Sequence, residues 1–138
     1  MPVVEELIRA EQDGTISFGN YKLGQKSKKS DFEYQGDIYK VKTYNEITKL
    51  ERNEMFVYES VPGTVAEHFR VTDDTVEFEV EAIRMPRLPV QLENDTDYEV
   101  YVDGVAVGSM KTNMSGKLSV SVELEEGTSV KVKAVKRA

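Results

Sequence analysis

The chain of 138 residues contains no cysteine, no tryptophan and a single histidine, and these absences exclude several kinds of site. Without cysteine there can be no disulfide, thiolate metal ligand or thiol nucleophile. One histidine, His68, is too few for the usual zinc sites, and a Ser–His–acid relay would have to pass through it. No Gly-x-Ser-x-Gly motif supplies a nucleophile for such a relay. The sequence therefore predicts no catalytic residues, no metal site and no cofactor.

Basic charge is also scarce, because 18 Lys and Arg residues face 25 Asp and Glu residues and give a formal net charge of −7. A nucleic-acid-binding protein needs a basic surface that displaces counterions from phosphates, so we expect no nucleic-acid partner. No apolar run approaches the roughly 20 residues of a membrane span. The first residues, Met-Pro-Val-Val-Glu-Glu, carry acid where a signal peptide carries Lys or Arg. We expect no membrane partner and a cytoplasmic location.

After Gly14, apolar and polar residues alternate with the period of two that is typical of half-buried strands. Strands at this spacing, separated by turn signals, predict a mainly β protein: an antiparallel β-sandwich or a partly open barrel built from hairpins. The one helical signal lies before Gly14, where Val3, Val4, Leu7 and Ile8 are spaced as on one helix face. We therefore expect one short N-terminal helix within residues 2–13.

Four hairpins can be assigned with their registers. The paired segments are 31–35 with 38–42, 65–71 with 76–82, 98–102 with 105–109, and 118–124 with 130–134. The first turns at Gly36-Asp37, and the third at Asp103-Gly104, a strong hairpin signal. The expected opposed side chains include Phe32 with Val41, Tyr34 with Tyr39, Phe69 with Phe78, Arg70 with Glu77, His68 with Glu79, Val100 with Val107 and Val102 with Val105; in the fourth hairpin, Leu118, Val120, Val122 and Leu124 face Val130, Val132 and Ala134. We expect further strands at 15–23, 55–61 and 88–93, whereas 44–53 fits a strand or a helical turn.

Pro86 and Pro89 interrupt the alternation and mark a possible boundary. We expect residues 1–138 to form a single compact domain with two lobes. The first lobe, 1–84, holds the helix and an N-terminal sheet, and the second, 90–138, is a small immunoglobulin-like sheet. A flexible linker between the lobes is the alternative.

Exposed tyrosines are the best candidates for a binding surface, because sugar-binding modules stack rings on aromatic side chains. Tyr101 lies between Val100 and Val102, which we expect to point inward, so its ring should point outward. Glu99 and Asp103 lie beside it. The candidate surface comprises Tyr101, Glu99, Asp103, Tyr21 and Tyr58.

Two charged segments have a functional and a plainer interpretation. The lysines Lys26, Lys28 and Lys29 could hold a phosphate or an acidic polymer, although the first glycine of a Walker loop is missing and a solvated loop is the alternative. The stripe Glu77, Glu79 and Glu81 alternates with apolar residues. This pattern favours a solvated strand face over a two-carboxylate hydrolase site.

Three segments resemble a known family: Asp13-Gly14-Thr15-Ile16-Ser17-Phe18-Gly19-Asn20-Tyr21, residues 39–51 and residues 58–64. They are similar to short, uncharacterised bacterial proteins that often carry the transferred label endosialin or endosialidase-like, and the resemblance covers nearly the whole chain. The label implies a sialidase-like glycosidase. It brings no motif with known chemistry, so it assigns no functional residues.

These observations favour a noncatalytic β-sandwich that acts as an interaction or accessory module for an unknown protein partner. A carbohydrate-binding module that uses exposed tyrosines is the alternative, and a glycosidase is a remote one. The oligomeric state stays open.

Overall fold

The computed structural model describes residues 3–72, 74–82, 87–121 and 129–137, and these residues form strands and turns without any helix. The strands are β1 (Ile8–Ala10), β2 (Ile16–Phe18), β3 (Ser27–Tyr34), β4 (Asp37–Thr43), β5 (Thr48–Arg52), β6 (Met55–Ser60), β7 (Val65–Val71), β8 (Thr75–Glu81), β9 (Arg87–Gln91), β10 (Asp97–Val102), β11 (Val105–Lys111), β12 (Lys117–Ser121) and β13 (Ser129–Lys136).

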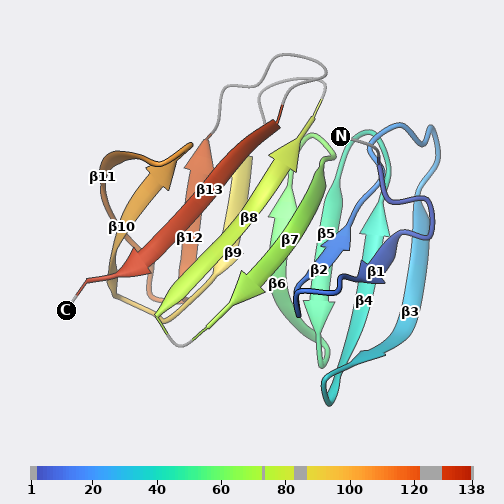
Figure 1. The fold of residues 1–138 in the computed structure, drawn as a ribbon, viewed down its shortest axis with the longest axis horizontal. Coiled ribbons are helices and arrows are strands. Elements are labelled where there is room, and N and C mark those ends of the chain that lie inside the picture. Colours follow the sequence, from blue (N-terminus) through green and yellow to red (C-terminus); the bar gives the residue numbers. More distant parts are fainter. Residues whose placement is uncertain (1–2, 73, 83–86, 122–128, 138) are drawn as a thin grey trace.

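The strands form two antiparallel sheets (Figure 1). One sheet has seven strands in the order β1-β2-β7-β8-β13-β10-β11, and the other has six in the order β12-β9-β6-β5-β4-β3. Neither sheet closes on itself in the described residues, so each has two edge strands. Side chains of both sheets pack into one hydrophobic core. The mainly β, sandwich-like fold predicted from the alternation is confirmed.

Four aromatic rings form the centre of the core. Tyr58 of the six-stranded sheet packs edge-on against Phe18, Phe69 and Phe78 of the seven-stranded sheet, with ring centroids 5.1 to 5.9 Å apart. Such pairs contribute about 0.5–1.5 kcal/mol beyond the area they bury. The Tyr58 hydroxyl lies 2.8 Å from the hydroxyl of Thr64, which satisfies its polar end. This cluster joins the two sheets.

The predicted N-terminal helix is wrong. Residues 8–10 form β1, the Val4 N–H donates to the Gly19 carbonyl, and Leu7 has a left-handed φ of 73°. The apolar side chains are still used, because Val4 and Ile8 are fully buried. A helix of about three turns is marginal alone. Pairing with β2 satisfies backbone hydrogen-bonding groups of this segment within a sheet. It also buries apolar side chains that a helix would have buried.

The register of the first hairpin was also mispredicted. Its turn is Gln35-Gly36, with φ of 50° and 84°, so Tyr34 lies opposite Asp37. Phe32 therefore faces Tyr39 rather than Val41. Positive φ at both central residues is the geometry of the type I′ turn, in which glycine occupies the second central position. The prediction placed this glycine first.

The second and third hairpins are correct near their turns and depart from prediction beyond a β-bulge. Arg70 faces Glu77 as expected, but the bulge between Glu67 and Arg70 places Glu67, not His68, opposite Glu79. The rings of Phe69 and Phe78 are in contact, with centroids 5.6 Å apart.

In the third hairpin, Asp103-Gly104 forms the predicted turn, with φ of 51° and 81°, and Val102 faces Val105. A shift in register then sets Val100 opposite Gly108 instead of Val107.

The fourth hairpin is not formed by the residues that the structure describes. β12 pairs with β9 in the six-stranded sheet, while β13 lies between β8 and β10 in the other sheet. The predicted burial nevertheless holds for Leu118, Val120, Val130 and Val132. Val122 and Leu124 fall outside the described residues. Alternation shows which side chains face the core, and it leaves the pairing partner open because both sheets face the same core.

The two halves of the chain lie side by side and share both sheets (Figure 1). β8 pairs with β13 over seven residue pairs, and Tyr58 of β6 pairs with Val90 of β9. The ambiguous segment 44–53 contributes the strand β5.

Candidate functional site

The outer face of the seven-stranded sheet carries an open groove of about 780 Å³ that crosses β7, β8, β13 and β10. On its floor, Arg70 faces Glu77, Glu77 faces Lys133, and Lys133 faces Tyr101. We call these four residues the mixed row. Opposite charges directly across neighbouring strands contribute about 0.2–1 kcal/mol per pair. The charges of the mixed row are therefore explained as cross-strand pairs that stabilise the sheet.

His68 lies at one end of this groove with Asp13 and Thr15. Its Nδ1 is 3.0 Å from the Asp13 carboxylate and 3.2 Å from the Thr15 hydroxyl. In a catalytic triad the acid and the hydroxyl contact opposite ring nitrogens, so that a proton can pass between them. Here both contact the same nitrogen. This cluster has the residue types of a relay but not its geometry.

A second polar cluster adjoins the groove on β1, β2 and β7. Ser17 donates a hydrogen bond of 2.7 Å to Glu11 and accepts one of 3.1 Å from the His68 N–H. The Ser17 hydroxyl lowers the pKa of the Glu11 carboxyl, and the Arg9 guanidinium acts in the same direction. Glu67 is the opposite case: burial raises its pKa, and its Oε1 has no hydrogen-bond partner. The pKa values of these two neighbouring carboxyl groups are thus shifted in opposite directions.

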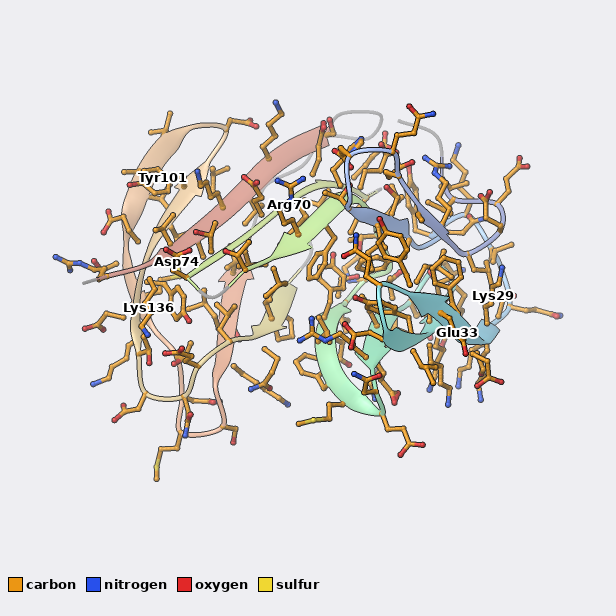
Figure 2. The ribbon with its side chains drawn as sticks, turned by 60° about the horizontal axis from the view of Figure 1, so that its bottom comes forward. Lys29, Glu33, Arg70, Asp74, Tyr101 and Lys136 are labelled. Atoms are coloured by element: carbon orange, nitrogen blue, oxygen red, sulfur yellow. The ribbon has the colours of Figure 1, made fainter. Side chains whose placement is uncertain are left out.

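Only part of the predicted tyrosine surface is exposed. Tyr101 is half-buried and lines the groove, at the opposite end of the molecule from Lys29 and Glu33 (Figure 2). Tyr21 is buried against Val4 and Val65, and Tyr58 is fully buried in the core, so neither can meet a ligand.

The two acidic candidates beside Tyr101 have structural partners. Glu99 accepts a hydrogen bond of 3.0 Å from the Ser109 hydroxyl. Asp103 accepts one of 2.9 Å from the Lys131 N–H, and its own N–H donates to the Lys131 carbonyl. They position β11 and the hairpin turn.

The predicted solvated glutamate stripe is correct for two of its three members. Glu77 and Glu79 are partly exposed, but Glu81 is buried, with 2% of its surface accessible. Glu81 is the last residue of β8 and pairs with Val65 and Ser129. A stripe of alternating residues does not reveal that one of its ends is covered.

The outer face of the six-stranded sheet holds a different arrangement, three lysines directly opposite one another on consecutive strands. Lys28 of β3 faces Lys42 of β4, and Lys42 faces Lys49 of β5. We call Lys28, Lys42 and Lys49 the lysine row. The positive charge of Lys26, together with burial and the charges of its row neighbours, lowers the pKa of Lys42.

A hollow of about 660 Å³ adjoins the lysine row. Its lining comprises Lys26, Lys42, Tyr44, Glu46, Ile47, Val61 and Pro62. Sequence reasoning identified Lys26 and Lys28 but missed Lys42 and Lys49, which lie on other strands. Lys29, the third predicted lysine, instead places its Nζ 5.6 Å from the centroid of the Phe32 ring.

The long edge strands of the two sheets differ in charge. β3 carries Lys28, Lys29, Asp31 and Glu33 and has a bulge between Lys29 and Phe32. β11 carries no charge from residue 105 to residue 110, and every one of its residues but Met110 is exposed. Val105 and Val107 are 65% and 53% exposed.

Within the described ranges, no three His, Cys, Asp or Glu side chains gather closely enough to hold a metal ion. In the same residues, no helix is long and apolar enough to cross a membrane.

No protein-family model, no curated protein and no solved structure matches this chain. The resemblance to the endosialin-like proteins therefore stays a prediction, and the function has to be inferred from the geometry.

Proposed function

We propose that this chain is a noncatalytic, cytoplasmic interaction module that binds protein by strand addition along β11. The observation that carries the proposal is the free edge of β11, a seven-residue strand at the end of its sheet with no charge over residues 105–110. An exposed edge offers a row of unpaired N–H and C=O groups, and an extended chain can pair with them.

Proteins usually block such edges with charges, prolines or bulges. β3 follows this rule, because it combines four charged side chains with a bulge. β11 has a bulge opposite Val100, but it presents Val105 and Val107 to solvent without a charge between them. The same chain thus protects one long edge more fully than the other.

The charges at the two ends of β11 favour a second copy of this chain as the partner. Asp103 precedes the strand, and Lys111 ends it. In an antiparallel pair of β11 strands, each Asp103 approaches the Lys111 of the other copy, whereas a parallel pair would bring like charges together. Lys111 now pairs with Asp95 at 3.4 Å, but both side chains are exposed, so this ion pair contributes little and can be exchanged.

Sedimentation velocity over a wide range of protein concentration tests the proposal. The wild type should shift from monomer to dimer as concentration rises. Val107→Lys should remain monomeric, because it places a charge on an exposed side chain at the centre of the edge. Ser30→Lys, on the exposed part of β3, is the matched control and should dimerise like the wild type.

Hydrogen exchange measured at the same concentrations locates the contact. The amides of residues 105–110 should gain protection as the dimer forms. A wild type that stays monomeric at every concentration contradicts the proposal, as does a Val107→Lys variant that dimerises unchanged or a Ser30→Lys variant that no longer dimerises.

Carbohydrate binding in the groove is the second candidate, because Tyr101 lines it beside Lys131 and Lys133. The ring of Tyr101 could stack on a sugar, with the lysines near its polar groups. Tyr101 and Phe78 are the aromatic residues in the described lining, and Phe78 is buried in the core. A single accessible ring supports this function less well than the bare edge supports protein binding.

A further inference from the structure

We propose that the hollow beside the lysine row is a binding site for a small organic anion, a phosphate or carboxylate group carried on a compact ring or aliphatic body. Lys42 of the lysine row and Lys26 would bind the anionic group, and the apolar side of the hollow would bind the body. This site is independent of the β11 edge and lies on the other sheet.

The first support is the arrangement of like charges. Lys42 has a lysine directly opposite it on both neighbouring strands, Lys28 on one side and Lys49 on the other. Like charges directly opposite each other destabilise a sheet. The chain has more acidic than basic residues, and it still concentrates lysines at this place. A bound anion would remove the repulsion.

The residues next to the row show that acids are available where the fold uses them. Lys40, two residues before Lys42 on β4, faces Glu51 on β5. Lys49 faces Glu59 on β6 and lies 4.0 Å from Glu51 along its own strand. Lys42 is the member of the row with lysine on both sides, and it also lines the hollow.

The second support is the lining of the hollow. Its volume of about 660 Å³ lies in the range of small-molecule sites, which are mostly apolar with a few polar groups that fix orientation. Ile47, Val61 and Pro62 supply the apolar part. Tyr44 adds a ring whose hydroxyl donates a hydrogen bond of 2.9 Å to Glu46. Lys26 and Lys42 supply two positive charges to the same lining, against the one negative charge of Glu46.

This combination selects the class of ligand. Lysine binds phosphate and carboxylate as a compact point charge with three donors. An inorganic ion would use the lysines and leave the apolar lining in water. A neutral sugar would use the lining and leave the lysine repulsion in place. An organic anion uses both.

Thermal unfolding and calorimetric titration with defined probes test the site. The probes are glucose 6-phosphate and glucuronate, with glucose, inorganic phosphate and poly-glutamate as comparisons, all at equal ionic strength. Glucose 6-phosphate or glucuronate should bind and raise the melting temperature more than either glucose or inorganic phosphate does. Comparing these two anions distinguishes a phosphate from a carboxylate ligand.

Two matched variants on β4 separate the site from general surface charge. Lys42→Gln should lose the ligand-induced shift, and without ligand it should melt at a higher temperature than the wild type, because the repulsion is gone. Lys40→Gln removes the same charge beside Glu51 and should keep the ligand-induced shift. Its melting temperature without ligand should be unchanged or lower.

Several results would overturn the proposal. These are no shift beyond that of sodium chloride, an equal shift with inorganic phosphate, binding of poly-glutamate alone, or equal loss of the shift in both variants. A Lys42→Gln variant that is less stable than the wild type without ligand would show that the lysine row is not repulsive, which would also overturn the proposal.

Discussion

The outer faces of the two sheets contain similar residue types in opposite arrangements. On the seven-stranded sheet, the mixed row alternates Arg70, Glu77 and Lys133, so each charge faces its opposite. On the six-stranded sheet, the lysine row sets three like charges side by side. The first arrangement stabilises its sheet without a ligand, whereas the second sets like charges together, which a bound anion would offset in our proposal. The comparison indicates that the residue across the strand decides whether a charge stabilises the sheet or repels its neighbour.

The long edge strands of the two sheets also differ in charge. The six-stranded sheet ends in β3, which carries four charged side chains, and the seven-stranded sheet ends in β11, which has no charge before its last residue, Lys111. The two strands lie at opposite ends of the molecule (Figure 1). The two proposed binding features therefore lie on different sheets, an edge on one and a face on the other, and we expect a single substitution to remove each of them.

The largest effect should follow a change in the core on which both sheets depend. Val120 is 3% exposed, in a cluster formed by both halves of the chain. Val120→Asp buries an unpaired charge, which costs several kcal/mol, and because the sheets share the core we expect them to unfold together. Circular dichroism during thermal unfolding measures this.

Ser119→Asp, on the exposed side of the same strand, is the control and should change the melting temperature little. Unfolding of Val120→Asp in two separate steps would contradict the shared core and would favour the alternative of two lobes joined by a flexible linker.

A smaller effect should follow when the charge arrangements are exchanged. Glu77→Lys places a third cation between Arg70 and Lys133, so it should lower the free energy of unfolding by about 1 kcal/mol, since two favourable pairs become unfavourable. Lys42→Glu places an acid between two lysines and should raise stability by a similar amount. Chemical denaturation of both variants measures the difference. If both substitutions shift stability in the same direction, the cross-strand partner does not decide whether a charge stabilises or destabilises its sheet.

The sequence was sufficient for what depends on local pattern. The alternation predicted the mainly β fold and the burial of Val120 and Val132, and the Asp-Gly pair predicted the turn at residues 103–104, because solvent exposure and turn chemistry are properties of the segment itself. The N-terminal segment failed for the same reason: its spacing fits a helix and a strand edge, and the contact with Gly19 that decides between them is not local.

Pairing and site geometry depend on strands that are distant in the sequence. Nothing local to Lys42 indicates that Lys28 and Lys49 flank it, since that requires the registers of two hairpins, and the first of them differs from the predicted one. β-Bulges have the same effect at Glu67, where one extra residue changes which side chain faces Glu79. The candidate Tyr21 lies in a turn after β2 and is covered by Val4 and Val65, and Tyr58 faces the core between the sheets; neither contact is local in the sequence.

The smallest expected effect concerns the exception within the seven-stranded sheet, where Glu67 faces another acid, Glu79. Burial raises the Glu67 pKa, so its charged form destabilises the fold above that pKa, and this cost disappears as pH falls. Glu67→Gln should therefore raise the melting temperature at neutral pH and have no effect in acid. Glu11, whose pKa is lowered by the Ser17 hydroxyl, contributes stability that is present at neutral pH and lost as pH falls from about 4.3, the ordinary value of glutamate. Glu11→Gln should lower the melting temperature at neutral pH and also have no effect in acid. Melting temperatures of both variants, measured from neutral to acidic pH, test this prediction. Shifts of the same sign at neutral pH would show that burial and hydrogen bonding do not shift the two carboxyl pKa values in opposite directions.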